Sequence, residues 1–293
     1  MGGAEMIDAR TRLYGIIGNP VRHSLSPLIH NRALKRMGIN AAYLAFEVND
    51  VESAVKGIRG LGLQGVSVTL PFKTNIISYL DNVDTMATKI RAINTIINQG
   101  GRLIGCNTDW SGALAALEEK VELNGKRVYL LGAGGAGRAI AFGLKGRGCK
   151  VTIVNRSAER AAGLADELGF DHRPLRFLAT LDRLDTDVLI NATSVGMHPR
   201  EDVSPVPKTI LHKGITVMDI VYHPLRTVLL REAEEQGCQT IHGLEMLAHQ
   251  GAAQLELWTG KKADIEQIKE DLLKAIESRP DPRPGAESVT LGP

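Results

Sequence analysis

Apolar residues follow two regular patterns along this chain. Short apolar runs predict buried strands at residues 14–18, 42–48, 65–70, 127–131, 150–154, 188–191 and 216–220. Apolar residues spaced three and four apart predict helices at residues 27–37, 51–61, 136–144, 243–258 and 265–276. Strands and helices that alternate in this way are typical of an α/β protein.

The turn after the strand at 127–131 is rich in glycine. Gly132, Gly134 and Gly137 match the pattern G-x-G-x-x-G, which supplies a tight turn, a close backbone approach to a pyrophosphate and tight helix–strand packing. Glycines alone are weak evidence, because any tight turn can use them. Here a strand precedes the loop, and a helix and a second strand follow it, so the sequence predicts a dinucleotide-binding β-α-β unit.

The end of the strand at 150–154 indicates which dinucleotide binds. NAD sites usually carry an acidic side chain about 20 residues beyond the loop, whereas NADP sites place an arginine nearby. This chain has Asn155-Arg156-Ser157 and then Arg160, while Glu159 lies past the strand tip. A guanidinium can make two charge-assisted hydrogen bonds to the 2′-phosphate. We therefore predict NADP as the cofactor; the alternative is an arginine that is merely solvated at a strand end.

The glycine loop lies near the middle of the chain, so a whole domain precedes it. The sequence predicts a substrate-binding α/β domain with an open sheet at residues 1–109, and an NADP-binding Rossmann-like domain at 110–243. The C-terminal helices at 244–278 are predicted to join the first domain, and residues 105–117 lead from the first domain into the second. The proline-rich residues 279–293 predict a disordered tail. We expect the active site in the cleft between the two domains.

Composition narrows the classes of partner. The 293 residues are 43% hydrophobic, enough for two cores, and the net charge of +2 gives no case for binding nucleic acid or an anionic membrane. No apolar run is long enough to span a membrane, and residues 1–10 lack the apolar core of a signal peptide. Cys106, Cys149 and Cys238 are too widely spaced to suggest a disulfide framework or a metal site. We expect a cytoplasmic protein that binds a small molecule and is a monomer or homodimer.

Polar side chains in the first domain lie where strands end and helices begin. Ser24 and Ser26 could present two hydroxyls to a carboxylate or polyol; the simpler alternative is that Ser26 caps a helix, with Pro27 as its first residue. Thr69 and Lys73 follow the strand at 65–70, and open α/β sheets bind ligands at the carboxyl ends of their strands. The alternative for Lys73 is a solvated surface charge.

Two further motifs, Ala92-Ile93-Asn94-Thr95 and Asn107-Thr108-Asp109-Trp110, place polar groups between apolar runs. Asp109 together with Lys73 would form a carboxylate–ammonium pair. A lysine is a suitable general acid or base where an alcohol and a carbonyl interconvert, because one proton moves in that reaction. The sequence therefore offers Lys73 and Asp109 as candidates for proton transfer.

Nine motifs follow one another in order. They are Gly18-x-Pro20-x-x-His23-Ser24-x-Ser26-Pro27-x-x-His30-Asn31, Val68-Thr69-x-Pro71-Phe72-Lys73, Ala92-Ile93-Asn94-Thr95, Asn107-Thr108-Asp109, Gly132-Ala133-Gly134-Gly135-Ala136, Asn155-Arg156-Ser157-x-x-Arg160, Asn191-Ala192-Thr193-Ser194-x-Gly196-Met197, Asp219-x-x-Tyr222-x-Pro224-x-x-Thr227 and Gly243-x-x-Met246-Leu247-x-x-Gln250-Gly251-Ala252. Together they resemble the shikimate dehydrogenase family over residues 14–260. Any one motif could arise by chance, but nine in register could not.

The resemblance implies reversible, NADPH-dependent reduction of 3-dehydroshikimate to shikimate in aromatic amino acid biosynthesis. It implies Lys73 as general acid/base, with Asp109 as its partner and a substrate contact. By the same resemblance Ser24 and Ser26 bind the carboxylate with Tyr222 nearby, and Thr69, Asn94 and Gln250 contact ring hydroxyls. The implied cofactor residues are Gly132, Ala133, Gly134, Gly135 and Ala136, then Asn155, Arg156, Ser157 and Arg160, with Ile220 and Gly243 near the nicotinamide.

The chain departs from the family pattern at three positions. Ser67 stands where Asn is frequent, Trp110 where Gly is frequent, and Leu255 where Phe is usual. The first two leave the substrate preference open. One alternative is a quinate/shikimate dehydrogenase paralogue, although such paralogues tend to carry an acid where this chain has Ser157. Others are a reductase of a different carbonyl and a dinucleotide-sensing regulator, although the regulator would be expected to have lost Lys73 or Asp109.

Overall fold

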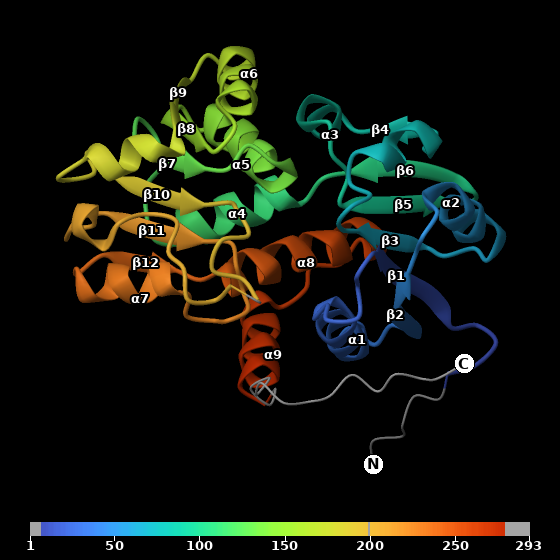
Figure 1. Cartoon of the computed structure of the whole chain (residues 1–293). Coiled ribbons are helices and arrows are strands. Elements are labelled where there is room, and N and C mark those ends of the chain that lie inside the picture. The colour runs from blue at the N-terminus through green and yellow to red at the C-terminus, as the bar shows by residue number, and fades with distance from the viewer. Residues whose placement is uncertain (1–6, 199, 279–293) are drawn as a thin grey trace, which may run out of the picture.

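The computed structural model describes residues 7–198 and 200–278, so the predicted disordered tail at 279–293 lies outside the described residues. Two six-stranded sheets stand side by side, and the long helix α8 (Gly243–Thr259) runs between them (Figure 1). This arrangement confirms the predicted α/β class, with an N-terminal sheet and a separate Rossmann-like sheet.

The N-terminal sheet has the strand order β2-β1-β3-β5-β6-β4 and is mixed. Its strands are β1 (Arg12–Gly18), β2 (Ala41–Glu47), β3 (Gly65–Val68), β4 (Asn82–Val83), β5 (Thr95–Gln99) and β6 (Arg102–Cys106). β1 pairs in parallel with β2 and β3, whereas β5 runs antiparallel to β3 and β6. β5 and β6 form a hairpin because Gly100 and Gly101 both have positive φ, which a tight two-residue turn requires.

Helices α1 (Ser26–Arg36), α2 (Val51–Gly60) and α3 (Thr85–Ile90) belong to the first part of the chain. β3 ends at Val68, two residues before the predicted end of that strand. The chain turns there, because the Thr69 carbonyl accepts a hydrogen bond from the Phe72 N–H at 3.0 Å. This turn brings the chain to Lys73 at the carboxyl end of the sheet.

Short 3₁₀ helices lie at Asn75–Tyr79, Leu175–Thr180 and Lys208–Ile210.

The second sheet is parallel throughout, in the order β12-β11-β10-β7-β8-β9. Its strands are β7 (Arg127–Leu131), β8 (Lys150–Asn155), β9 (Asp171–Pro174), β10 (Val188–Asn191), β11 (Thr216–Asp219) and β12 (Gln239–Ile241). Helices α5 (Gly135–Gly146), α6 (Ala158–Leu168) and α7 (Val228–Glu235) connect them. The strand order reverses between β7 and β10, and ligands of such sheets bind at this point of reversal.

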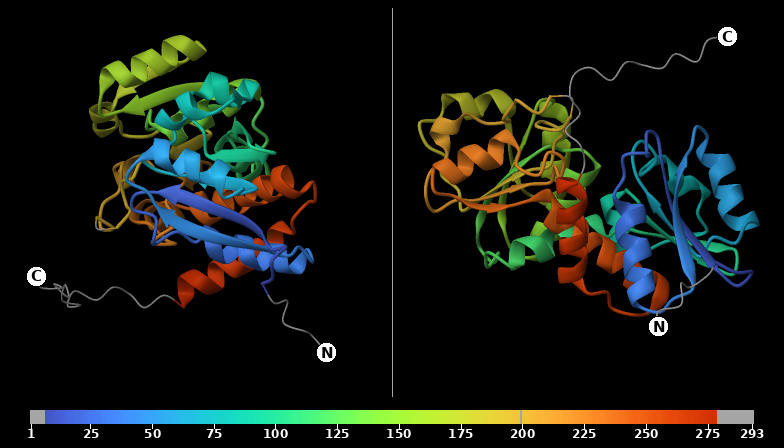
Figure 2. Two further views of the ribbon diagram at one scale, coloured as in Figure 1. Left: turned by 90° about the vertical axis from the view of Figure 1, so that its right-hand side faces the viewer. Right: turned by 90° about the horizontal axis from the view of Figure 1, so that it is seen from below.

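Two helices join the two sheets, and a third packs beside them. Residues 105–117, which were expected to link the domains, form the end of β6 and most of α4 (Asp109–Glu118). α4 crosses α8 closely at Gly112, where an added methyl group would lie 2.7 Å from the Cβ atom of Gln250. The last helix, α9 (Ile265–Glu277), shares an apolar cluster with α1 and α8. Figure 2 shows α8 and α9 between the two halves of the molecule.

Candidate active site

Lys73 and Asp109 form the predicted carboxylate–ammonium pair. Lys73 Nζ lies 2.6 Å from Asp109 Oδ2, and the two side chains are 18% and 8% exposed. The Lys73 carbonyl accepts from the Ile93 N–H at 2.7 Å, which fixes this turn against the chain that leads into β5. Asp109 is the first residue of α4, and its N–H donates to Asn107 Oδ1 at 2.9 Å. Both residues follow parallel strands, β3 and β6, so they meet at the carboxyl end of the N-terminal sheet.

Asn94 holds the second oxygen of the Asp109 carboxylate. Asn94 Nδ2 donates to Asp109 Oδ1 at 2.8 Å, while Asn94 Oδ1 accepts from the Thr108 N–H at 2.7 Å. Because a backbone N–H can only donate, the bond to Thr108 fixes the orientation of the amide. Asn94 Nδ2 also lies 3.4 Å from Gln250 Oε1 on α8. The structure thus brings together four of the predicted residues, Lys73, Asn94, Asp109 and Gln250.

Ser24 and Ser26 lie together at the start of α1. Ser24 Oγ accepts a hydrogen bond from the Ser26 N–H at 3.2 Å. The N-cap residue of α1 is Leu25 and no side chain caps the helix, so the alternative in which Ser26 is the cap is wrong. Burial raises the pKa of the Tyr43 phenol, against the effect of its hydrogen bonds to Ser67 and Ser26. The Ser26 hydroxyl is therefore close to Tyr43 in the buried interior.

Thr69 follows β3 and Tyr222 follows β11. The Thr69 N–H donates to the Ile17 carbonyl at 3.0 Å, at the end of β1. An added methyl group on Gly18 would lie 2.3 Å from Thr69 Cγ2, so only glycine leaves room for the threonine there. Tyr222, in the loop after β11, packs against the apolar cluster that contains Leu25. The loop after β11 therefore reaches the apolar cluster that α1, α8 and α9 share.

The glycine loop joins β7 to α5. Gly132 has φ +104°, and a methyl group on it would lie 2.9 Å from the Ala192 carbonyl oxygen. A methyl group on Gly137 would lie only 2.1 Å from the Gly132 carbonyl oxygen, whereas one on Gly134 or Gly135 would meet nothing within 4 Å. Close packing therefore requires Gly132 and Gly137, while the start of α5 stays open to a ligand. Open N–H groups at a helix start bind phosphate well.

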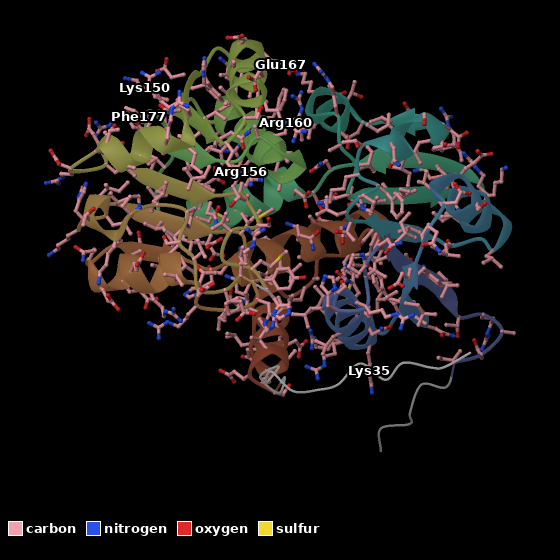
Figure 3. All side chains as sticks on the ribbon, in the orientation of Figure 1. Lys35, Lys150, Arg156, Arg160, Glu167 and Phe177 are labelled. Carbon is pink, nitrogen blue, oxygen red and sulfur yellow. The ribbon has the colours of Figure 1, made fainter. Side chains whose placement is uncertain are left out.

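The end of β8 carries the predicted arginines. Ser157 is the N-cap residue of α6, and its hydroxyl accepts from the Arg160 N–H at 3.3 Å. The side chains of Arg156 and Arg160 are exposed, and neither forms an ion pair with any residue that the structure describes. Figure 3 shows both near the strand ends of the second sheet, toward the N-terminal half. Two exposed guanidinium groups in this position fit the 2′-phosphate of NADP.

Ile220 and Gly243 lie in contact. A methyl group on Gly243, the first residue of α8, would lie 2.4 Å from the Ile220 carbonyl oxygen. The absence of a side chain at Gly243 lets the helix begin directly against the end of β11. The two residues predicted to lie near the nicotinamide are thereby placed together.

A second row of polar residues behind the site was missed from the sequence. Ser67 is 4% exposed, Thr95 0% and Gln254 1%, so all three are buried. Gln254 follows Gln250 by one helical turn, and residues four apart share a face of a helix. This four-residue spacing was the signal in the sequence that could have identified Gln254. Nothing in the local sequence indicates the partners of Ser67 and Thr95.

In residues 7–198 and 200–278, the structure contains no helix long and apolar enough to cross a membrane. The same ranges contain no group of three histidine, cysteine or carboxylate side chains placed to hold a metal ion.

Three features define an NADP-dependent oxidoreductase. They are the parallel sheet with its open glycine loop, the exposed arginines beside that loop, and the lysine–carboxylate pair at the carboxyl end of the other sheet. Comparison with known families identifies the particular family. The chain matches the shikimate dehydrogenase substrate binding domain at residues 16–96, shikimate/quinate 5-dehydrogenase at 114–221, and the shikimate 5′-dehydrogenase C-terminal domain at 243–273.

Full-length relatives agree with these matches. The NADP(+) shikimate dehydrogenase of Pyrococcus furiosus is 46% identical, over 94% of this chain and 100% of the relative. That of Thermococcus kodakarensis is 48% identical, over 92% and 99%. The crystal structure of the Thermus thermophilus shikimate 5-dehydrogenase in complex with NADP(H) and shikimate superposes with a TM-score of 0.84 at 38% identity, covering 90% of this chain and 100% of that one. The chain belongs to the NADP-dependent shikimate dehydrogenase family, which confirms the predicted family, enzyme class and cofactor.

Proposed function

We propose that this chain interconverts 3-dehydroshikimate and shikimate with NADP as cofactor, in the biosynthesis of aromatic amino acids, and that Lys73 and Asp109 carry the proton. The observation that carries the residue assignment is the 2.6 Å contact between Lys73 Nζ and Asp109 Oδ2. A carbonyl that becomes an alcohol must gain one proton at oxygen. The Lys73 ammonium donates that proton, and in the reverse direction the amine accepts it.

Asp109 and Asn94 orient the lysine. Asp109 Oδ2 holds Lys73 Nζ, while Asn94 Nδ2 holds Asp109 Oδ1 at 2.8 Å, so the carboxylate is held from two sides. The substrate carboxylate binds Ser24 and Ser26 with Tyr222 beside them. Thr69, Asn94, Asp109 and Gln250 contact the ring hydroxyls. A polyol with one carboxylate suits this set, because the set consists of hydroxyl and amide groups with one ammonium and one carboxylate.

NADPH, when bound, supplies the reducing equivalents of the reaction. The residues that would hold its pyrophosphate are Gly132, Ala133, Gly134, Gly135 and Ala136. The adenosine ribose and its 2′-phosphate would contact Asn155, Arg156, Ser157 and Arg160, with Ile220 and Gly243 near the nicotinamide. The open start of α5 and the two exposed guanidinium groups, which form no ion pair with a described residue, support this assignment.

The predicted domain division belongs to the same proposal, with a substrate domain at 1–109 and 244–278 and a cofactor domain at 110–243. The cluster in which Leu255 and Ile268 pack against Ile29 and Leu34 supports the assignment of the C-terminal helices to the first domain. A cytoplasmic location and a monomeric or homodimeric state stay predictions.

The test is a steady-state assay of purified protein with shikimate and with quinate, each with NADP and with NAD. We expect turnover of shikimate with NADP. The kcat/KM should be at least about tenfold higher for NADP than for NAD, because NAD has no 2′-phosphate and so loses a charge-assisted contact with the arginines. Equal kcat/KM for the two cofactors would contradict the role of Arg156 and Arg160. A higher kcat/KM for quinate than for shikimate would favour the quinate/shikimate dehydrogenase alternative.

A further inference from the structure

Behind the proposed site, a row of hydrogen bonds leads from Tyr43 on β2 to Asp109. Tyr43 Oη lies 2.6 Å from Ser67 Oγ, and Ser67 Oγ lies 2.9 Å from Gln254 Oε1. Gln254 Nε2 lies 2.9 Å from Thr95 Oγ1, and Thr95 Oγ1 lies 2.7 Å from Asn94 Oδ1. Asn94 Nδ2 then meets Asp109 Oδ1 at 2.8 Å.

Backbone groups fix the direction of every one of these bonds. Gln254 Nε2 donates to the Asn94 carbonyl at 3.1 Å, and a carbonyl can only accept. The oxygen of the Gln254 amide therefore faces Ser67, so the Ser67 hydroxyl must donate to it. Tyr43 in turn must donate to Ser67.

The same reasoning fixes the other half of the row. The Thr95 hydroxyl accepts from Gln254 Nε2, so its hydrogen is free to point at Asn94 Oδ1. The Thr108 N–H also requires Asn94 Oδ1 as its acceptor, at 2.7 Å. Asn94 consequently turns its NH₂ group toward Asp109. Every donor from Tyr43 onward points toward the carboxylate.

The row is buried over its whole length. Tyr43 and Thr95 are 0% exposed, Gln254 1%, Asn94 2% and Ser67 4%, so water does not compete for these bonds. Burial lowers the pKa of His30, which stacks on the Tyr43 ring at 4.3 Å, to about 4. His30 is therefore neutral at neutral pH and adds no charge beside the row. Hydrogen bonds that all run in one direction polarise one another in such a medium.

We propose that Tyr43, Ser67, Gln254 and Thr95 are positioning residues, which hold the Asn94 amide and through it the Asp109 carboxylate in the orientation needed to bind the substrate ring and steady Lys73. This inference rests on the proposed function. It also assigns a role to Ser67, one of the positions where the chain departs from its family. The hydrogen of Ser67 is committed to Gln254, so Ser67 acts through the row and donates nothing to a ligand.

The decisive variant is Thr95→Val, which keeps the shape of the side chain and removes the hydroxyl in the middle of the row. We expect kcat/KM for shikimate to fall about tenfold, the size of effect expected from one buried hydrogen bond. KM for NADP should stay within twofold, because the row touches no part of the cofactor site. Thr95→Ser restores the hydroxyl and should recover at least half of the wild-type kcat/KM.

Thr186→Val is the matched control. Thr186 is also a buried threonine, 5% exposed, but it bonds the carbonyls of Arg127 and Val188 at the start of β7 and β10 in the second sheet. This variant should lose thermal stability as Thr95→Val does and keep its kcat/KM for shikimate. An equal loss of kcat/KM in both variants would show a general packing effect and refute the positioning role.

Tyr43→Phe covers the case in which Thr95→Val does not fold. It removes the Tyr43 hydroxyl, and with it the bonds to Ser67 and Ser26, and keeps the ring on His30. We expect a fall of about threefold in kcat/KM for shikimate, again with KM for NADP unchanged. If the wild type turns over shikimate and Thr95→Val keeps its kcat/KM, the positioning role alone is refuted. If Thr95→Val does not fold, an unchanged kcat/KM in Tyr43→Phe refutes it in the same way. Absence of wild-type turnover would refute the proposed function and the positioning role with it.

Discussion

Replacing Lys73 by alanine separates the chemistry of the site from its contribution to stability. The substitution removes an ammonium that is 18% exposed and 2.6 Å from a carboxylate that is 8% exposed. General acid–base catalysis by a placed side chain is worth about 10²–10⁴ in rate, which corresponds to about 3–5 kcal/mol of the activation barrier. We therefore expect kcat for shikimate oxidation to fall by that factor, with a smaller change in KM.

The effect of Lys73→Ala on folding should be smaller. Asp109 loses one partner but keeps the Asn94 N–H at 2.8 Å, so the free energy of unfolding should fall by about 1–3 kcal/mol. For a chain of this length each kcal/mol lowers Tm by about 2–4 °C, so the variant remains folded at 25 °C. The assays are steady-state turnover with NADP and shikimate, and thermal unfolding followed by circular dichroism.

Lys269→Ala is the matched control for Lys73→Ala. Lys269 is 14% exposed and binds the Glu119 carboxylate at 2.9 Å, away from the proposed site. Its loss should lower Tm by a similar amount and leave kcat within twofold of the wild type. A kcat for Lys73→Ala within tenfold of the wild type would refute proton transfer by Lys73. An equal loss of kcat in Lys269→Ala would show that the effect is structural.

Three further outcomes follow from the geometry. Arg156→Ala should raise KM for NADP by about tenfold or more and change KM for NAD less than twofold. Tm should stay unchanged, because the side chain is exposed and forms no ion pair with a described residue. Equal effects on the KM values of both cofactors would contradict this prediction. Gly137→Ala should destabilise the fold by about 2 kcal/mol or more in urea unfolding, because its methyl group would lie 2.1 Å from a backbone oxygen, whereas Gly146→Ala in the same helix has open space and should be neutral or stabilising. Burial raises the pKa of Asp219 from 3.8 to about 6, so the native state binds this proton more tightly than the unfolded state. The contribution of Asp219 to the free energy of unfolding therefore falls by up to about 3 kcal/mol as pH rises from 4 to 6. Asp219→Asn should remove that part of the pH dependence of unfolding, and an unchanged slope would show that Asp219 is ionised throughout.

Local sequence was sufficient for the cofactor half of the molecule. A strand, a glycine loop, a helix and a second strand within about 30 residues form one β-α-β unit, so Gly132, Gly137 and Arg156 could be placed without knowing the rest of the fold. The candidate pair Lys73 and Asp109 was also visible, because each follows a strand end. The mixed order of the N-terminal sheet was not predicted, because the strands at Thr95–Gln99 and Arg102–Cys106 are short and their hairpin depends on two glycines with positive φ.

The sequence by itself determined the α/β class, the nucleotide loop and which residue types could do chemistry, because turns and strand ends are set by neighbours in the chain. The tertiary structure alone decided how those residues are held. Gln254 bonds Ser67 across 187 positions of sequence and Thr95 across 159, and only the crossing of α4 and α8 at Gly112 brings α8 so near to Asp109. Hydrogen-bond direction depends on which backbone groups face each side chain, and folding creates those neighbours.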